Sequence, residues 1–150
     1  MIIAVAVMAA IVIAVLFYFL MRASGGGAVP PTLAGAIRSG SPEFAEHQSK
    51  IHLDDPEAYE SKRALGDIVM SLQTTVRNFT GRTINGLELK GMVVDHQGKP
   101  INQQTVVVIP GRQAELAPNK TMPVDIRLEG MTDSDDRANI KMEVTGFKLK

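Results

Sequence analysis

Cysteine and tryptophan are absent from this chain of 150 residues, and so is any net charge. Without cysteine the chain cannot form a disulfide framework, a thiolate metal centre or a thiol nucleophile. The 16 basic residues balance 16 acidic ones, which argues against nucleic-acid binding, because a domain that binds nucleic acid normally has a basic face. The length suits one domain of modest size.

Motifs for catalysis and cofactor binding are also missing from the sequence. It contains no Gly-x-Ser-x-Gly, no Gly-x-Gly-x-x-Gly and no phosphate-binding loop, and Gly25-Gly26-Gly27 follows an apolar segment instead of a strand. His47 and His52 fall in a region that we interpret as a linker, and His96 falls in a turn, so we do not expect converging zinc ligands. We therefore predict a protein that is not an enzyme, with no metal, no cofactor and no evident small-molecule substrate.

One acidic run, Asp133-Ser134-Asp135-Asp136, has the composition of a calcium loop. An EF-hand loop needs Gly at its sixth position and Glu at its twelfth. Counting from Asp133, those positions hold Ala138 and Val144. We interpret the run as a polar loop between two strands.

What the chain does have is one long apolar run, residues 1–21, without a single charged side chain. A helix of this length rises roughly 31 Å, about the thickness of the hydrocarbon core of a bilayer. Phe17, Tyr18 and Phe19 lie at its far end, where aromatic rings favour the membrane interface, and Arg22 ends the span. The run predicts a transmembrane helix over 1–21 in a single-pass protein of the cell membrane, with the lipid bilayer as its first partner.

Two other readings of the run fit less well. A cleaved signal peptide needs a basic residue before the core and a shorter core, and a type IV pilin-like helix needs a leader and an early Glu. Ala6 and Ala10 are four residues apart, so in a helix they share one face. Small residues let helices approach closely in a membrane, so we predict that this face packs against another subunit.

Residues 22–66 change character, with Gly and Pro recurring throughout and acids outnumbering bases between Glu43 and Asp67. Such a composition is typical of a tether that holds a domain away from the bilayer. Two interpretations of the acidic part fit: a stretch that is simply solvated, and a docking segment that becomes ordered when it binds a partner.

From Asp67 onward apolar and polar residues alternate with period two, in short stretches separated by turn residues. These stretches are 68–76, 87–93, 103–109, 122–128 and 140–149. Short alternating strands with turns between them favour an antiparallel β-sandwich over residues 67–150. Asn78 and Gly81 mark the first reversal, and Phe79 and Phe147 are the only aromatic residues expected in an otherwise aliphatic core.

A resemblance to a known family is carried by turn residues and strand pairs. They are Val76-x-Asn78, Leu87-x-Leu89, Val93-Val94-Asp95-x-x-Gly98-Lys99 and Leu116-x-Pro118-Asn119. The succession resembles the FxLYD-type domains, and related bacterial domains of unknown function that follow one N-terminal transmembrane helix in acidobacterial proteins. This resemblance implies an immunoglobulin-like or fibronectin-like sandwich over 67–149, no enzymatic activity and an extracytoplasmic location. Arg22 and Arg38, counted by the positive-inside rule, favour the cytoplasmic side instead. Of the two we adopt the extracytoplasmic side.

Two functions fit these features. The first is a small accessory or structural subunit of a larger membrane complex, with other membrane proteins as partners. The second is a stand-alone membrane-tethered module that captures a peptide or protein on a sheet edge. Val106, Val107, Val108 and Ile109 are apolar on both faces of a strand, so they are either fully buried or an interaction edge.

Overall fold

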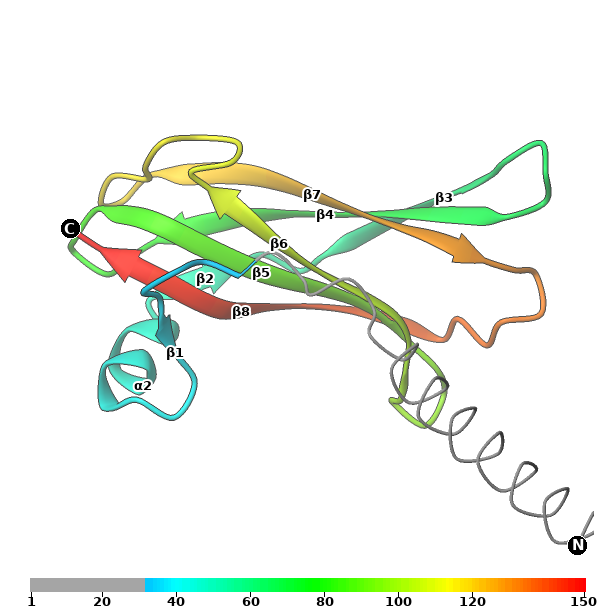
Figure 1. Ribbon diagram of the computed structural model, residues 1–150, viewed down its shortest axis with the longest axis horizontal. Coiled ribbons are helices and arrows are strands. Elements are labelled where there is room, and N and C mark those ends of the chain that lie inside the picture. Colours follow the sequence, from blue (N-terminus) through cyan, green and yellow to red (C-terminus); the bar gives the residue numbers. More distant parts are fainter. Residues whose placement is uncertain (1–31) are drawn as a thin grey trace, which may run out of the picture. The chain divides into compact units, whose positions relative to one another are not determined.

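The computed structural model describes residues 32–150 (Figure 1). The predicted transmembrane helix over 1–21 lies outside the described residues. The same holds for the residues assigned to it, which are Ala6, Ala10, Phe17, Tyr18, Phe19 and Arg22. Within residues 32–150, no helix has both the length and the apolar character that crossing a bilayer requires.

The described residues are mostly antiparallel β-structure, so the all-β prediction is confirmed. The elements of the first half are β1 (Ile37–Arg38), α2 (Pro42–Gln48), β2 (Ile51–Leu53), β3 (Glu57–Lys62) and β4 (Ile68–Asn78). Those of the second half are β5 (Ile84–Val94), β6 (Pro100–Ile109), β7 (Thr121–Met131) and β8 (Asn139–Leu149). Strands β4 to β8 coincide with the five stretches in which apolar and polar residues alternate.

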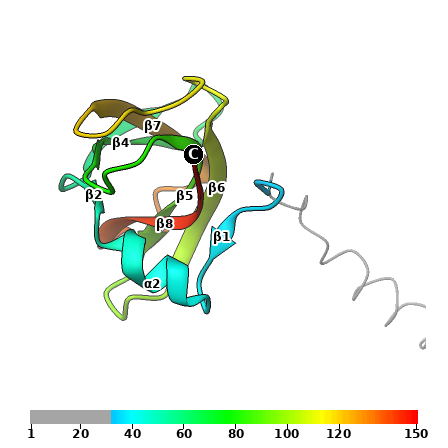
Figure 2. The ribbon, with the colours of Figure 1, turned by 90° about the vertical axis from the view of Figure 1, so that its left-hand side faces the viewer.

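The strands form two sheets, which face each other in Figure 2. Sheet A has the order β1-β8-β5-β6. In sheet B, β4 is central, with β7 on one side and β2 and β3 along the other. Every pairing is antiparallel, and pairs such as β4–β7 and β5–β8 join strands that are not consecutive in the chain.

Both sheets contribute their alternate side chains to one core. Its largest fully buried members are Ile68, Leu72, Ile84, Leu87, Leu89, Ile109, Leu116, Ile126, Leu128, Met131 and Phe147. Gly91 shows how closely the sheets approach, since a Cβ atom there would lie 3.2 Å from Cγ2 of Ile126 and 3.2 Å from Cδ1 of Leu72. A side chain at this point of β5 would require Ile126 and Leu72 to shift by a few tenths of an ångström.

The turn predicted after β4 is confirmed, and it is held by a buried side chain. The Asn78 amide nitrogen donates to the carbonyl oxygens of Arg82 and Leu116, both at 2.8 Å. Its oxygen accepts from the backbone N–H of Thr80 at 3.0 Å. Gly81 has φ +77°, a conformation that L side chains rarely adopt.

The linker prediction over 22–66 is wrong for its described part, 32–66, which forms β1, α2, β2 and β3. Its Gly and Pro residues are located at the boundaries of these elements. Gly40 turns with φ +96°, Ser41 is the N-cap of α2, and Pro42 is the first helical residue, where its missing N–H has no cost. Phe44 and Ile51 are buried in the core and hold residues 42–53 against the two sheets.

Two aromatic assignments change with this segment. Phe44, and not Phe79, is the partner of Phe147, with ring centroids 5.4 Å apart, while Phe79 is 55% exposed. His47, which we assigned to the linker, is buried and meets the Phe147 ring edge-on, with ring centroids 6.5 Å apart. The core therefore has its aromatic cluster under α2.

Candidate interaction surface on strand β8

Strand β8 has two segments with different surroundings. Along one edge it pairs with β5 from Asn139 to Leu149. Along the other edge β1 pairs with it at only two positions, Phe147 and Gly146. We call residues 146–149 the covered segment and residues 139–145 the open segment, because in the part of the chain that the structure describes no strand adjoins the second edge of 139–145.

The covered segment lies beneath the residues that join β1 to β2. Helix α2 places Phe44 and His47 against the fully buried ring of Phe147. The helix begins where the Ser41 hydroxyl accepts a hydrogen bond from the backbone N–H of Phe44 at 3.2 Å. Figure 2 shows α2 beside this end of the two sheets.

A buried carboxylate fastens the same chain segment to the outer face of sheet A. The side chain of Glu88 on β5 is only 3% exposed. Arg38 donates to it through both terminal nitrogens, Nη1 to Oε1 at 2.7 Å and Nη2 to Oε2 at 2.8 Å. The backbone N–H of Leu33 donates to Oε2 at 2.8 Å, and the Thr145 hydroxyl donates to Oε1 at 2.7 Å. We call this group the Glu88 clamp.

The clamp keeps its acid ionised. Hydrogen bonding from Arg38 lowers the pKa of Glu88 to about 2 against the opposing effect of burial, and the bonds from Leu33 and Thr145 add to the lowering. All four contacts stabilise the charged form, so at neutral pH Glu88 serves as a fixed anion and not as a proton carrier. Arg38 lies 50 residues from Glu88 in sequence, inside the supposed linker, so nothing local in the sequence could have paired them.

The open segment alternates between an apolar and a charged face. Ile140 and Met142 are half-buried and pack against the core, while Lys141 and Glu143 are exposed on the outer face. Glu143 is 2.7 Å from the ammonium nitrogen of Lys90 on the neighbouring strand. Within residues 32–150, Lys141 has no such ion pair.

Two grooves lie beside this strand. The first, of about 360 Å³, separates the open segment from α2 and β2. It is lined by Ala45, Gln48, Ser49, Ile51, His52, Leu53, Met142, Glu143 and Val144. The second, of about 240 Å³, is lined by Ala58, Met70, Val93, Arg137, Ala138, Asn139 and Ile140. Apolar side chains of the open segment thus reach solvent at both ends.

The predicted interaction edge at Val106, Val107, Val108 and Ile109 lies on β6. Val108 and Ile109 are fully buried, and Val106 packs half-buried against the core. In the described chain β6 pairs with β5 alone, but β7 approaches its other side. Most of these apolar side chains pack in the core and are not available to a partner. Binding through these four residues stays a prediction.

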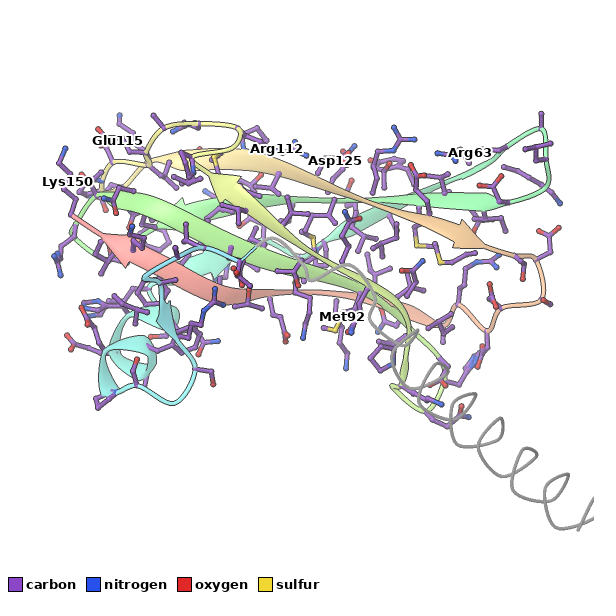
Figure 3. The ribbon with its side chains drawn as sticks, in the orientation of Figure 1. Arg63, Met92, Arg112, Glu115, Asp125 and Lys150 are labelled. Carbon is purple, nitrogen blue, oxygen red and sulfur yellow. The ribbon has the colours of Figure 1, made fainter. Side chains whose placement is uncertain are left out.

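Side-chain bonds cross from the β6 region to the backbone of β7. The Asn102 amide donates to the carbonyl oxygen of Glu129 at 2.8 Å, and the Arg112 guanidinium donates to that of Asp125. Arg112 and Asp125 are labelled side by side in Figure 3. These bonds link the two sheets on either side of residues 106–109, where an added strand would have to approach.

A further cavity, of about 500 Å³, lies over β4 and β7 and is lined mainly by polar residues. Its acids include Asp54, which Arg77 holds through two contacts of 2.7 Å, and the guanidinium lowers the pKa of that carboxyl. His96 is exposed and does not line this cavity, and its Nδ1 lies 2.5 Å from Oδ1 of Asp136. Among the described residues no three His, Asp or Glu side chains are placed to hold a metal ion.

Comparison with known proteins identifies no family. No family model matches the chain, and no curated protein matches it. Among solved structures, the chain is similar to the X-ray structure of the Northeast Structural Genomics Consortium target SoR45. The two are 12% identical with a TM-score of 0.42, over 69% of this chain and 86% of the other. The FxLYD-type resemblance stays a prediction.

Proposed function

We propose that this chain is a non-catalytic, single-pass membrane protein and a small accessory subunit of a larger membrane complex. The observation that carries the proposal is the Glu88 clamp, which fixes the chain from Leu33 onward to the β-domain. The apolar run over 1–21 supplies the anchor, and the resemblance to extracytoplasmic domains supports that side of the membrane. Other subunits of the membrane are the partners.

The clamp shortens the tether. With residues from Leu33 onward attached to sheet A, only residues 22–32 separate the apolar run from the domain. A chain of that length spans at most roughly 40 Å when fully extended. A short connection of this kind suits a subunit that contacts neighbouring membrane proteins.

We further propose that the domain has immunoglobulin-like or fibronectin-like topology. Immunoglobulin domains place strands A, B, E and D in one sheet and C, F and G in the other, and the variable type adds C′ to the second sheet. The order β2/β3–β4–β7 corresponds to A, B and E, and β6–β5–β8 corresponds to C′, C and F. In this correspondence β8 is strand F.

A second candidate is the stand-alone membrane-tethered module that captures a peptide or protein. The open segment favours it, because a free sheet edge can bind an extended chain through main-chain hydrogen bonds. Such a module keeps its affinity when the anchor is removed, whereas an accessory subunit loses much of it.

The test is extraction of the full chain from membranes, followed by measurement of its native size and of co-migrating chains. We expect resistance to alkaline carbonate, release by mild detergent and migration with a defined set of larger subunits. Release by carbonate contradicts anchoring. Migration free of other proteins contradicts the accessory role and favours the tethered module.

A matched pair of variants addresses the predicted helix face. Replacing Ala6 and Ala10 together with Leu blocks close helix approach, and we expect recovery of the partners to fall roughly fivefold. Ala4→Leu is the control, because a helix places Ala4 about 160° from Ala6. Equal recovery in all three chains contradicts the assigned packing face.

A further inference from the structure

We propose that the open segment of β8 pairs antiparallel with the open segment of a second copy of this chain, centred on Met142. The pairing joins the two A sheets edge to edge. It is independent of the anchoring proposed above, because it concerns only residues described in the β-domain.

The open segment is the least protected edge of the two sheets. Proteins usually guard edges with charges, Pro, bulges or covering segments. Strand β3 is short and charged, with Lys62 ion-paired to Asp133 and Glu60 to Arg137. The β6 side is bonded to the backbone of β7, as described above. The open segment has no Pro or Gly, and it exposes part of Ile140 and Met142.

The charge pattern selects the register. Residues directly opposite each other in a sheet share a face, so a two-fold pairing of β8 with itself must centre on a residue. Centring on Lys141 or Glu143 places like charges opposite each other, which is destabilising. Centring on Met142 places Lys141 opposite Glu143 of the second copy, and Glu143 opposite its Lys141.

The apolar face matches in the same register. Ile140 lies opposite Val144 of the second copy, and the two Met142 side chains meet at the two-fold axis. These side chains line the grooves beside β8, so the pairing covers apolar surface that one copy leaves exposed. Lys141, which has no ion pair in the described part of one copy, gains a carboxylate partner.

The length of the pairing matches the length of the free edge. With Met142 at the centre, Asn139 lies opposite Thr145 of the second copy, so residues 139–145 of each chain are used. The next residue along, Gly146, is where β1 begins to pair with β8. The dimer therefore leaves the two positions that pair with β1 in place. It adjoins the Glu88 clamp at Thr145, whose hydroxyl donates to Glu88 and whose carbonyl oxygen accepts from Arg38 at 3.5 Å.

Disulfide trapping tests the register directly, because the natural chain has no cysteine and gives no background. In the full chain in mild detergent, Met142→Cys places two thiols opposite each other, at a separation that a disulfide can span. We expect mild oxidation to link most chains as dimers. Gln104→Cys, exposed on β6, is the matched control and should remain monomeric.

Charge reversal tests the pairing without relying on a cysteine. Lys141→Glu places two Glu–Glu pairs in the dimer, and Glu143→Lys places two Lys–Lys pairs. We expect each to raise the dimer dissociation constant roughly tenfold or more. A mixture of the two variants forms opposite-charge pairs at both positions, so the mixed dimer should regain the affinity of the natural chain.

Each result decides the proposal. Disulfide-linked dimers of the Met142→Cys variant, together with rescue in the mixture of charge variants, support it. A monomeric natural chain, equal trapping of the Gln104→Cys variant, or a mixture no tighter than either charge variant overturns it. Capture of a different protein by the Met142→Cys variant also overturns it, and assigns the edge to a strand of another chain. None of these readouts depends on resistance to alkaline carbonate or on co-purifying subunits, so the two proposals fail separately.

Discussion

The two segments of β8 belong to one strand and pair with the same neighbour, β5, yet their surroundings differ completely. The covered segment has β1 at its edge and α2 over Phe147. The open segment has no strand paired to its second edge in the described chain, a groove separates it from α2 and β2, and its apolar side chains reach solvent. The difference arises because residues 33–53 cover only one end of the strand. Stability should therefore depend mainly on the covered segment, and association on the open segment.

The largest expected effect comes from the aromatic cluster of the covered segment. Phe147→Ala removes a fully buried ring stacked on Phe44, and we expect it to lower the free energy of unfolding by about 3–5 kcal/mol. Met142→Ala in the open segment should cost about 1 kcal/mol or less, because Met142 is half-exposed. Urea unfolding followed by far-UV circular dichroism compares them. Equal losses contradict the division of β8 into two segments.

The Glu88 clamp should give the next largest effect. Glu88→Gln removes the charge that holds Arg38 and replaces an acceptor-only group with an amide, so we expect a loss of about 3 kcal/mol. Glu143→Gln is the matched control on the open segment, since its pair with Lys90 is exposed and should contribute less than about 1 kcal/mol. If the two variants have the same stability, the clamp is not what fastens residues 33–38.

Acid should loosen the covered segment selectively. Glu88 has a folded pKa of about 2 against an ordinary value of 4.5, so its contribution is full above pH 4.5 and is lost as the pH falls towards 2. By about pH 3 we expect protonation of this carboxyl alone to have lowered the free energy of unfolding by about 2 kcal/mol. Comparing the unfolding of the natural chain and of Glu88→Gln between about pH 7 and pH 2 isolates the contribution of Glu88. The two curves should converge in acid, and a constant gap contradicts the assignment.

The smallest of these effects concerns the start of α2. Ser41→Ala removes the hydroxyl that accepts from the N–H of Phe44, and we expect a loss of about 1 kcal/mol. Ser41→Gly should cost only a few tenths of that amount, because Gly is tolerated at an N-cap. Chemical denaturation measures both, and an Ala variant as stable as the natural chain shows that α2 is held by Phe44 alone.

The long strands could be predicted from the sequence because each is a long run of alternating residues over a shared core. Strands β4 to β8 follow that rule, and so does the turn at Asn78 and Gly81. Strands β1, β2 and β3 could not be recognised, because two are very short and all six residues of β3 are exposed. Glycine and proline near them indicated a linker, although here they mark element boundaries.

The candidate surface could not be located from the sequence. The run from Val106 to Ile109 is apolar on both faces, which left two interpretations, a fully buried strand or an interaction edge. The structure instead has its least protected edge at 139–145, where apolar and charged residues alternate. Which strand is an edge depends on the order of strands in the sheet and on which strands residues 33–53 pack against. Neither can be derived from alternation within a single strand.

Hydrogen–deuterium exchange of the full chain in mild detergent, at a low and a high protein concentration, would report pairing of the open segment amide by amide. We expect amides of residues 139–145 to gain protection as concentration rises, while those of the covered segment are protected equally at both. Residues 139–145 that exchange identically at the two concentrations would contradict pairing of the open segment.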